Sequence, residues 1–430
     1  MATFISSPNP PSECDGVKKV RSPRPRLTII LGMLIAGGFL SALLSPFSAS
    51  AQTGAPPLKE PAPAEEPPPV PTPPPATQPP TEQSRKAWHN AMVGVPLPKK
   101  GCFEAAYPST EWREVPCTTP PRHPLSPARG PKPYTVGGGN DYSAQTPRHS
   151  ILWAQGSFDS VTDVTNVTSF GVAGSYSLQL NTQFFITSFA GCSHGCRGWV
   201  QFVFENEPGL GGTALMQYWL LNYGIPCPAG WSSFNVIDCA TFSLNVVSVP
   251  FQPIGNLANL VLIGNVNWSG DNWVYLATAT RLYAANGDRY FQELGTNWRS
   301  AEFNIYGDCC STTANFNYLA TLVVRTSVFD GGGGPGGHGD VPSCVQSGTT
   351  AETNNLTLAA PCCSYGTEYG AYVPSIVFTE SYPARASMCS GGTSVPGNYS
   401  GGSDIALVTF TGLLAVWSLA RLCRHRRALQ

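Results

Sequence analysis

Charged residues are scarce in this chain of 430 residues, in which Asp, Glu, Lys and Arg make up only 12%. A typical soluble domain is about a quarter charged. The low value argues against a helical bundle or a coiled coil, because those folds need Lys, Glu and Arg on their outer faces. The formal net charge is -1, so no global basic field favours a nucleic-acid partner, and we expect none.

Lysine does not occur after Lys132, and residues 151–330 hold five Arg against eleven Asp plus Glu. Glycine, proline and aromatic residues are abundant instead. From residue 134 on, short β-branched and aromatic runs are broken by Gly, Asn, Asp or Pro, which is typical of a sandwich or barrel. We therefore predict an all-β fold, an antiparallel jelly-roll-like (concanavalin-like) β-sandwich stabilised by disulfides.

The pattern of short runs predicts the positions of the individual strands, and it predicts no long amphipathic helix in the body of the protein. The expected strands are 150–158, 175–186, 198–205, 214–222, 245–249, 259–267, 272–278, 288–293, 300–306 and 314–326. A further strand is expected at 376–379, near the C-terminus.

The N-terminus has the pattern of a secretory signal. Five basic residues precede position 27, an uncharged, mostly apolar run covers 27–44, and Ala49-Ser50-Ala51 predicts cleavage before Gln52. The alternative is an uncleaved membrane anchor, since a run of this length is long enough to span a bilayer.

A second apolar run, 405–420, precedes an arginine cluster that begins at Arg421. We expect a transmembrane helix over 405–421 with the tail in the cytoplasm and the body outside. Gly401-Gly402-Ser403 before it resembles bacterial C-terminal sorting tails. The predicted location is thus extracytoplasmic or at the cell surface, with the membrane as a partner.

Cysteine usage agrees with export, because twelve cysteines remain between the N-terminal leader and the C-terminal tail, and disulfides persist in oxidising compartments. Close pairs are 102/117, 192/196 and 227/239, while the vicinal pairs 309/310 and 362/363 are expected to bridge outward to different partners. A metal site at Cys192-Ser-His194-Gly-Cys196 is the alternative to a small disulfide loop there.

Composition divides the chain into seven segments. The residues at 56–80 include thirteen prolines, which predicts a semi-rigid polyproline spacer. The segments are a signal peptide (1–51), a Pro-rich linker (52–87), a cysteine-bounded lead-in (88–133), the β-sandwich core (134–330), a Gly-rich hinge (331–340), a Cys-containing tail module (341–400) and the transmembrane helix (405–421).

Standard catalytic motifs are missing. The chain has no Walker A loop and no His-Glu-x-x-His helix. Residues 134–400 hold only three histidines, His149, His194 and His338, which disfavours a Ser/His/Asp triad and a histidine-rich metal site. We expect no cofactor and no metal.

Strand alternation identifies a candidate acid/amide pair. In 199–205 the residues Val200, Phe202 and Phe204 form a core face, so Gln201 points away from the core. In 300–306 the same alternation turns Glu302 outward. A Glu can take a proton from water while a Gln donates a hydrogen bond to the forming oxyanion, which is enough to hydrolyse an amide bond.

This pair resembles the dyad of the glutamic peptidases, or eqolisins. Ala301-Glu302-Phe303 is similar to their Ala-Glu-Trp strand, and Tyr218-Trp219 occupies the place of an aromatic strand between their catalytic residues. The resemblance covers about 150–310. It implies a secreted β-sandwich that hydrolyses proteins at acid pH, with Glu302 as base and Gln201 as oxyanion donor.

The whole body, about 100–380, also looks like a group of secreted, uncharacterised, mainly bacterial proteins. The motifs that carry this resemblance are Gly101-Cys-Phe, Gly156-Ser-Phe158, Leu178-Gln-Leu-Asn181, Gln217-Tyr-Trp-Leu-Leu-Asn-Tyr-Gly224 and Thr350-Ala-Glu-Thr-Asn-Asn-Leu356. It implies a common fold and export, and no activity.

A non-enzymatic surface protein is the competing function. Gln201 and Glu302 would then be ordinary solvated residues. Trp199, Gln217 and Trp219 are the candidate binding residues for a protein ligand or a polysaccharide. Trp268, Trp273, Trp298 and Tyr275, with many nearby Asn and Gly, could stack on sugar rings, with ordinary core aromatics as the alternative.

Overall fold

A computed structural model gives the fold. It describes residues 81–129, 135–146, 148–192, 195–330, 342–359, 364–368 and 371–384. The predicted signal peptide, Gly-rich hinge and C-terminal membrane segment lie outside these residues, as do Cys362 and Cys363. No helix within the described ranges combines the length and the apolar character needed to cross a membrane.

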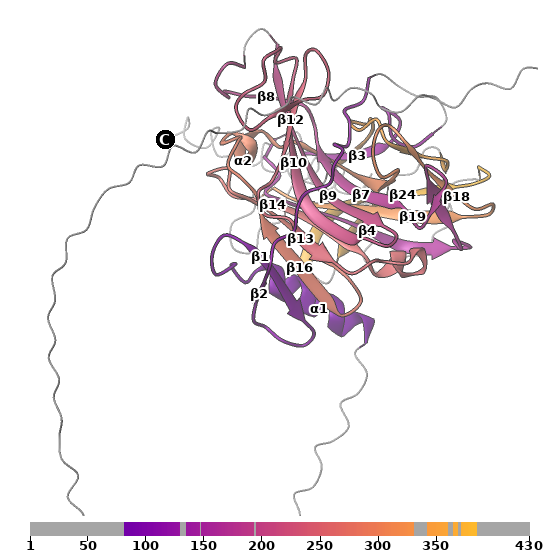
Figure 1. Cartoon of the computed structure of the whole chain (residues 1–430). Coiled ribbons are helices and arrows are strands. Elements are labelled where there is room, and N and C mark those ends of the chain that lie inside the picture. The colour runs from indigo at the N-terminus through magenta and orange to yellow at the C-terminus, as the bar shows by residue number, and fades with distance from the viewer. Residues whose placement is uncertain are drawn as a thin grey trace, which may run out of the picture. The chain divides into compact units, whose positions relative to one another are not determined.

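Two large antiparallel sheets form the body (Figure 1). The first contains, in spatial order, β2 (Arg113–Val115), β1 (Cys102–Ala106), β16 (Arg281–Asn286), β15 (Asn272–Ala277), β14 (Val261–Val266), β4 (Trp153–Thr162), β19 (Thr321–Phe329), β24 (Ala371–Ser381) and β22 (Thr357–Leu358), and β23 (Ser364–Glu368) also pairs with β24.

The second sheet contains, in spatial order, β11 (Ser232–Ser233), β12 (Cys239–Phe242), β10 (Gly211–Leu221), β9 (Arg197–Glu207), β7 (Tyr176–Thr182), β17 (Ser300–Tyr306), β3 (Tyr142–Gln145) and β20 (Ser343–Gln346). Two short strands extend it, β13 (Val247–Val249) along β10 and β8 (Phe185–Ile186) along β9. A small third sheet contains β21 (Thr353–Asn354), β18 (Thr313–Phe316), β5 (Val167–Ser169) and β6 (Val172–Ala173).

The main core lies between the two large sheets. Val200, Phe202 and Phe204 of β9 face Leu262 of β14 and Leu276 of β15 within one continuous apolar cluster. Period-two alternation produces this layer, because every second side chain of each strand points to the same face. The predicted all-β antiparallel sandwich is confirmed.

Two glycines make room for aromatic rings in this core. A Cβ on Gly156 would lie 1.9 Å from the ring of Phe303, and one on Gly264 would lie 2.5 Å from the ring of Phe202. Phe202 also stacks on Trp298, with ring centroids 5.4 Å apart. Trp298 is therefore a core residue and is not available to stack on a sugar.

The lead-in contributes elements of its own. Helix α1 (Glu82–Val93) packs Trp88 and Met92 against β1, β14, β15 and β16 on the outer face of the first sheet (Figure 1). Thr81 caps this helix by accepting a hydrogen bond from the Ser84 N–H. The helix was not expected from the sequence, and the predicted boundary at 87/88 falls inside it.

The three predicted short-range disulfides are present, Cys102–Cys117, Cys192–Cys196 and Cys227–Cys239. The disulfide loop is therefore the correct interpretation of residues 192–196. Cys309 forms no disulfide with a described residue, and its sulfur lies 2.8 Å from that of Cys310. The outward bridges expected for this vicinal pair stay a prediction.

Most of the expected strands exist, with shifted ends. The strand expected at 288–293 is wrong: β16 lies earlier, and the short helix α2 (Leu294–Asn297) follows. The run 314–326 is divided between β18 and β19, and the 3₁₀-helix η1 (Ile254–Asn259) precedes β14. The strand expected at 376–379 lies inside β24, which pairs with β19.

We predict that Gly156→Ala destabilises the fold, because its methyl group must displace the Phe303 ring from a close-packed layer. Overpacking of this kind costs about 1–3 kcal/mol. Denaturant unfolding measures the loss. Gly255→Ala is the matched control, since a Cβ there meets nothing within 4 Å. Equal stability of the two variants would contradict the packing described.

Candidate functional site

A row of polar side chains crosses four adjacent strands of the second sheet. Gln217 on β10 is opposite Gln201 on β9, which is opposite Asn181 on β7. Asn181 is in turn opposite Glu302 on β17. The core-facing neighbours in these strands alternate with the row, so the row lies on the face turned away from the main core. We call these four residues the polar row.

Gln201 is fully buried and held on both sides. Its Oε1 accepts hydrogen bonds from Gln217 Nε2 at 2.8 Å and from Trp219 Nε1 at 3.0 Å. Its Nε2 donates to Gln179 Oε1 at 3.1 Å. These contacts fix the amide plane and leave the second Nε2 hydrogen without a partner in the described part of the chain.

Glu302 is also buried, with 2% of its surface exposed. Its Oε2 accepts hydrogen bonds from the backbone N–H of Thr349 at 2.7 Å and from the Thr349 hydroxyl. The Tyr306 hydroxyl donates to Oε1 at 3.1 Å. Burial raises the pKa of Glu302, and the Thr349 hydrogen bonds oppose part of that rise.

Asn181 separates the two members of the predicted pair, so Gln201 and Glu302 share no hydrogen bond. Its amide lies near enough to Glu302 to favour the carboxylate, yet neither amide atom makes a hydrogen bond of normal geometry with any described residue. Buried amides rarely remain unpaired. Burial of all three side chains rules out the solvated alternative for Gln201 and Glu302.

Two more carboxyl groups lie beside Glu302. The Tyr306 hydroxyl contacts Asp141 Oδ2 at 2.7 Å as well as Glu302, and one phenol proton cannot serve both carboxylates. Asn304 Nδ2 donates to Asp141 and, at 3.0 Å, to Glu380 Oε2. Asp141, Glu302 and Glu380 therefore form one buried acidic cluster.

This cluster retains protons at neutral pH. Burial, and then the charges of Glu302 and Glu380, raise the pKa of Asp141 well above its usual range. Burial raises the pKa of Glu380 to about 8, despite hydrogen bonds from Asn304 and Asn354. Protonated carboxyls can donate hydrogen bonds, which is how such a group is tolerated without a cation.

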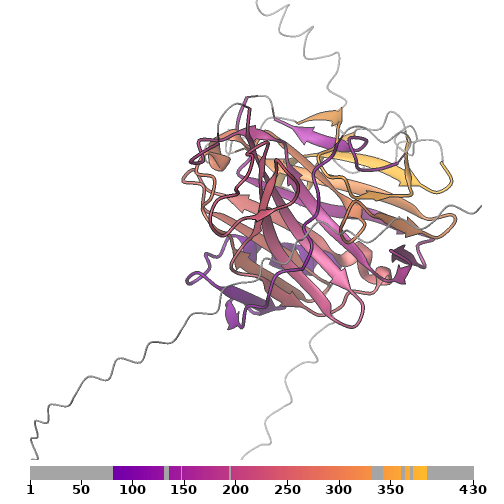
Figure 2. The same cartoon turned by 45° about the horizontal axis from the view of Figure 1, so that its top comes forward.

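An extended segment, residues 118–129, runs across the polar row, and we call it the strap. It is the purple segment that crosses in front of the magenta strands β9 and β10 in Figure 2. Four prolines, at 120, 121, 124 and 127, exclude a helix and favour an extended backbone.

The sheet holds the strap through backbone atoms. Gln217 Oε1 accepts from the Leu125 N–H at 2.9 Å, and Gln217 Nε2 donates to the Leu125 carbonyl at 2.7 Å. The Ser126 N–H donates to Glu352 Oε1 at 2.9 Å. The Ala351 N–H donates to the Ser126 carbonyl at 2.8 Å, and the Ala128 N–H donates to the Thr349 carbonyl at 2.7 Å.

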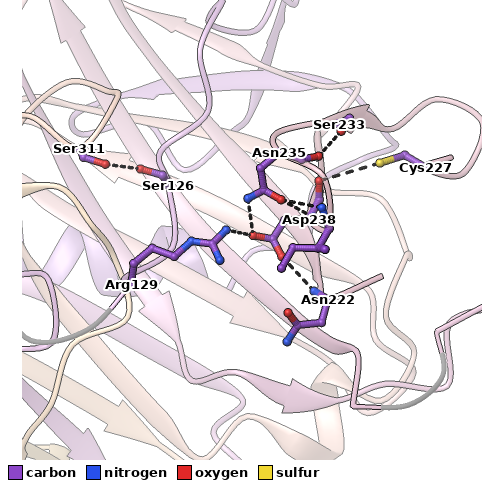
Figure 3. A network of polar contacts seen from close by, with 9 residues as sticks. Ser126, Arg129, Asn222, Cys227, Ser233, Asn235, Asp238 and Ser311 are labelled. Atoms are coloured by element: carbon purple, nitrogen blue, oxygen red, sulfur yellow. Dashed lines mark hydrogen bonds and ion pairs between the residues drawn. The ribbon is translucent and has the colours of Figure 1, made fainter. Parts of the chain in front are cut away.

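The side chains of Leu125 and Arg129 in the strap also contact the rest of the protein. Leu125 is buried among Val203, Leu215 and Val246, in a small cluster separate from the main core. At the end of the strap, Arg129 forms an ion pair with the buried carboxylate of Asp238 (Figure 3).

The first half of the strap borders an acidic cavity of about 550 Å³, in which Arg122 and His123 share the lining with Glu205, Glu207 and Asp308. Burial raises the pKa of Glu205 well above its usual range, with the nearby charges of Glu207 and Asp308 acting in the same direction.

The two tryptophans predicted to bind ligand are fully buried. Trp199 and Trp219 lie with ring centroids 6.0 Å apart in a small second core. Trp199 Nε1 donates to the Thr182 carbonyl at 2.9 Å, and Trp219 Nε1 donates to Gln201. In this structure Trp219 helps to orient Gln201, and a direct binding role for the two tryptophans stays a prediction. Gln217 hydrogen-bonds the backbone of Leu125 within the chain, and its role in binding a ligand likewise stays a prediction.

Sequence reasoning missed Asn181, Asp141, Glu380, Thr349 and the strap. Asn181 could have been found, because the alternation argument applied to 175–186 places Leu178 and Leu180 in the core and Asn181 outside it. The contacts of Asp141, Glu380 and Thr349 join segments far apart in the chain, which no local pattern reveals.

Comparisons with known proteins add little. No protein-family model matches the sequence, and no curated protein matches it. One similar solved structure is that of Scytalido-glutamic peptidase with a peptide-based transition-state analogue. It has a TM-score of 0.26 and 8% sequence identity, over 57% of this chain and 98% of that chain. A similarity of this size supports no functional argument. The resemblance to secreted bacterial proteins stays a prediction.

We predict that the melting temperature falls between pH 6.5 and 8, because the folded pKa of Glu380, about 8, lies above its ordinary value of 4.5. A raised carboxyl pKa gives stability that is complete below the unfolded pKa and is lost as the pH rises through the folded one, by up to about 1.4 kcal/mol per pH unit.

The window begins at pH 6.5 because the folded pKa of His89 is lowered by burial to about 4, so that His89 acts in the opposite direction only below 6.5. In calorimetry, the melting temperature of Glu380→Gln should fall less steeply with pH than that of the unaltered protein. The exposed control Glu82→Gln should keep the original slope. A slope unchanged in Glu380→Gln would refute the buried acidic cluster.

Proposed function

We propose that this protein is an exported surface protein whose second sheet binds an extended polypeptide over the polar row. The observation that carries the proposal is the contact between Gln217 and both backbone groups of Leu125. A side-chain amide that pairs with the N–H and the C=O of one residue can bind polypeptide backbone whatever its sequence.

The remaining contacts have the character of strand addition to a sheet edge. In that binding mode, main-chain hydrogen bonds supply affinity and side-chain pockets supply specificity. Residues 349–351 pair with the strap backbone, with an antiparallel bridge between Pro127 and Thr350. The strap thus lies over the polar row on the outer face of the second sheet in the way that a bound partner would.

The contacts of the strap also suggest the chemistry of a partner. The apolar site around Leu125 fits one leucine-sized side chain. Asp238 and the cavity with Glu205 and Glu207 favour basic residues on either side of it. A proline-containing segment loses little backbone entropy on binding, since it is already extended. The proposed partner is therefore a basic, proline-containing, extended polypeptide.

The proposed location outside the cytoplasm rests on the predicted signal and C-terminal anchor. The three disulfides fit it, because disulfides persist in oxidising compartments.

A second candidate is peptide hydrolysis at the same place, favoured by the unpaired Asn181 amide between Glu302 and Gln201. Glu302 would take a proton from water as the water oxygen attacks the peptide carbonyl carbon. The free Nε2 hydrogen of Gln201 would stabilise the oxyanion, and the proton on Glu302 would pass to the leaving amine. Thr349 covers the Glu302 carboxyl and itself pairs with Ala128 of the strap, so this candidate requires Thr349 to move away together with the strap. The solvation that follows would lower the Glu302 pKa.

The binding proposal predicts that displacing the strap creates a peptide site. Leu125→Asp places a charge among Val203, Leu215 and Val246 and should release the strap. A labelled peptide of residues 118–129 should then bind, as measured by fluorescence anisotropy. The intact protein should not bind it, because the tethered strap competes at a high effective concentration.

Three controls make this test specific. Leu244→Asp alters an exposed leucine, so this variant should behave like the intact protein and should not bind the peptide. A peptide with Asp in place of its leucine should bind poorly. Adding Gln217→Ala to the displaced variant removes two backbone hydrogen bonds, worth about 2 kcal/mol together, or roughly 30-fold in affinity. A Leu125→Asp protein that melts cooperatively and binds no peptide would rule out the proposal.

The hydrolase candidate predicts that the Leu125→Asp protein cleaves denatured protein substrates somewhere between about pH 2 and 7. Glu302→Gln in that background should lower the rate by about 10²–10⁴-fold, as loss of a general base does. The exposed Glu111→Gln is the control. Cleavage that survives Glu302→Gln, or no cleavage at any pH, would remove this candidate and leave peptide binding untouched.

A further inference from the structure

A pocket of about 510 Å³ lies on the outer face of the first sheet, away from the strap. Strands β14, β15 and β16 line it on one side, and the chain that follows α1, with Lys99 and Lys100, lines it on the other. Its volume falls within the range of about 300–1,000 Å³ that is usual for small-ligand sites.

An aromatic ring flanked by two amides forms the wall on the sheet side. Trp273 on β15 is opposite Asn265 on β14 and opposite Asn286 on β16. Val274 and Leu276, which alternate with Trp273 along β15, belong to the main core, so Trp273 points outward. Tyr275 packs against Trp112, with ring centroids 6.0 Å apart, and supports this wall.

These side chains keep unused binding capacity. Within the described part of the chain, the half-buried Trp273 makes no ring–ring contact, and neither its Nε1 nor the Asn265 amide has a hydrogen-bond partner. Asn286 uses its Oδ1 to accept from the Gly101 N–H at 2.7 Å, which leaves its Nδ2 as a donor.

The charges around the pocket are nearly balanced. Asp271 forms a two-pronged ion pair with Arg289 and accepts from Asn267 Nδ2 at 3.0 Å, so its carboxylate is fixed in orientation. Lys99 pairs with Glu114 at 2.8 Å. Such a lining offers no concentrated positive charge for a phosphate and no concentrated negative charge for a cation.

We infer that this pocket binds a neutral oligosaccharide. The apolar C–H face of a hexose ring stacks on Trp273, and the neighbouring hydroxyls bond to the amides of Asn265 and Asn286. The fixed Asp271 carboxylate accepts from a further hydroxyl. An apolar wall with a few placed polar groups is the general form of a small-molecule site. The inference is independent of the proposed peptide site over the polar row, which lies on the other sheet.

The test is titration of the purified full chain with chitohexaose, cellohexaose and mannohexaose, followed by tryptophan fluorescence and calorimetry. Any detergent used must lack a sugar headgroup. We expect at least one of the three to bind and to change the fluorescence. Trp273→Ala should weaken that binding by about tenfold or more, corresponding to a stacking contribution of roughly 1.4 kcal/mol.

Trp268→Ala is the matched control, because Trp268 is 60% exposed beside the pocket and does not line it. Asn265→Ala is the second variant, since that side chain makes no hydrogen bond to any described residue, so no such bond is lost. Weaker binding in Trp273→Ala and Asn265→Ala with unchanged binding in Trp268→Ala supports the inference. No binding of any of the three at millimolar concentration, or undiminished binding in Trp273→Ala, overturns it.

Discussion

The hydrogen bonds between the strap backbone and the second sheet are the interaction on which the site depends. The outer face of that sheet carries amides and carboxyls, which would be solvated on an ordinary sandwich. Here the Leu125 backbone pairs with Gln217, and residues 349–351 pair with the strap and with Glu302. A largely polar face has thereby become a second interior, in which small apolar clusters around Leu125 and around Trp199 and Trp219 flank the polar row.

That second interior has an electrostatic cost, which the acidic cluster shows. Burial disfavours a carboxylate, and three carboxyls that share Tyr306 and Asn304 cannot all ionise. Protonation of a carboxyl removes its charge and with it the repulsion. The same burial raises the pKa of Glu302 and so disfavours the carboxylate form that a general base needs. Tight binding of the strap would therefore oppose the proposed hydrolysis at Glu302.

Sequence patterns predicted the sandwich and the direction of its side chains, because alternation is a local property. The core positions of Phe202 and Phe303 and the outward positions of Gln201 and Glu302 follow from it. The burial of this face could not be predicted, since its cover comes from distant parts of the chain. Thr349 contacts Glu302 from 47 positions away, and Leu125 contacts Gln217 from 92 positions away. The prediction that Trp298 could stack on a sugar was wrong for the same reason, because Phe202, which packs against it, lies on a strand distant in sequence.

One stretch of chain, residues 81–129, covers the outer faces of both sheets. Helix α1 covers the outer face of the first sheet, which β1 extends beside β16, and the strap covers the second. The Cys102–Cys117 disulfide closes the β1–β2 hairpin just before the strap begins, and Cys117 itself bridges to Val247 of the second sheet. The strap can therefore leave the polar row while the cover of the first sheet stays in place. The two proposed sites, one for polypeptide and one for sugar, are mechanically separate although consecutive residues build both.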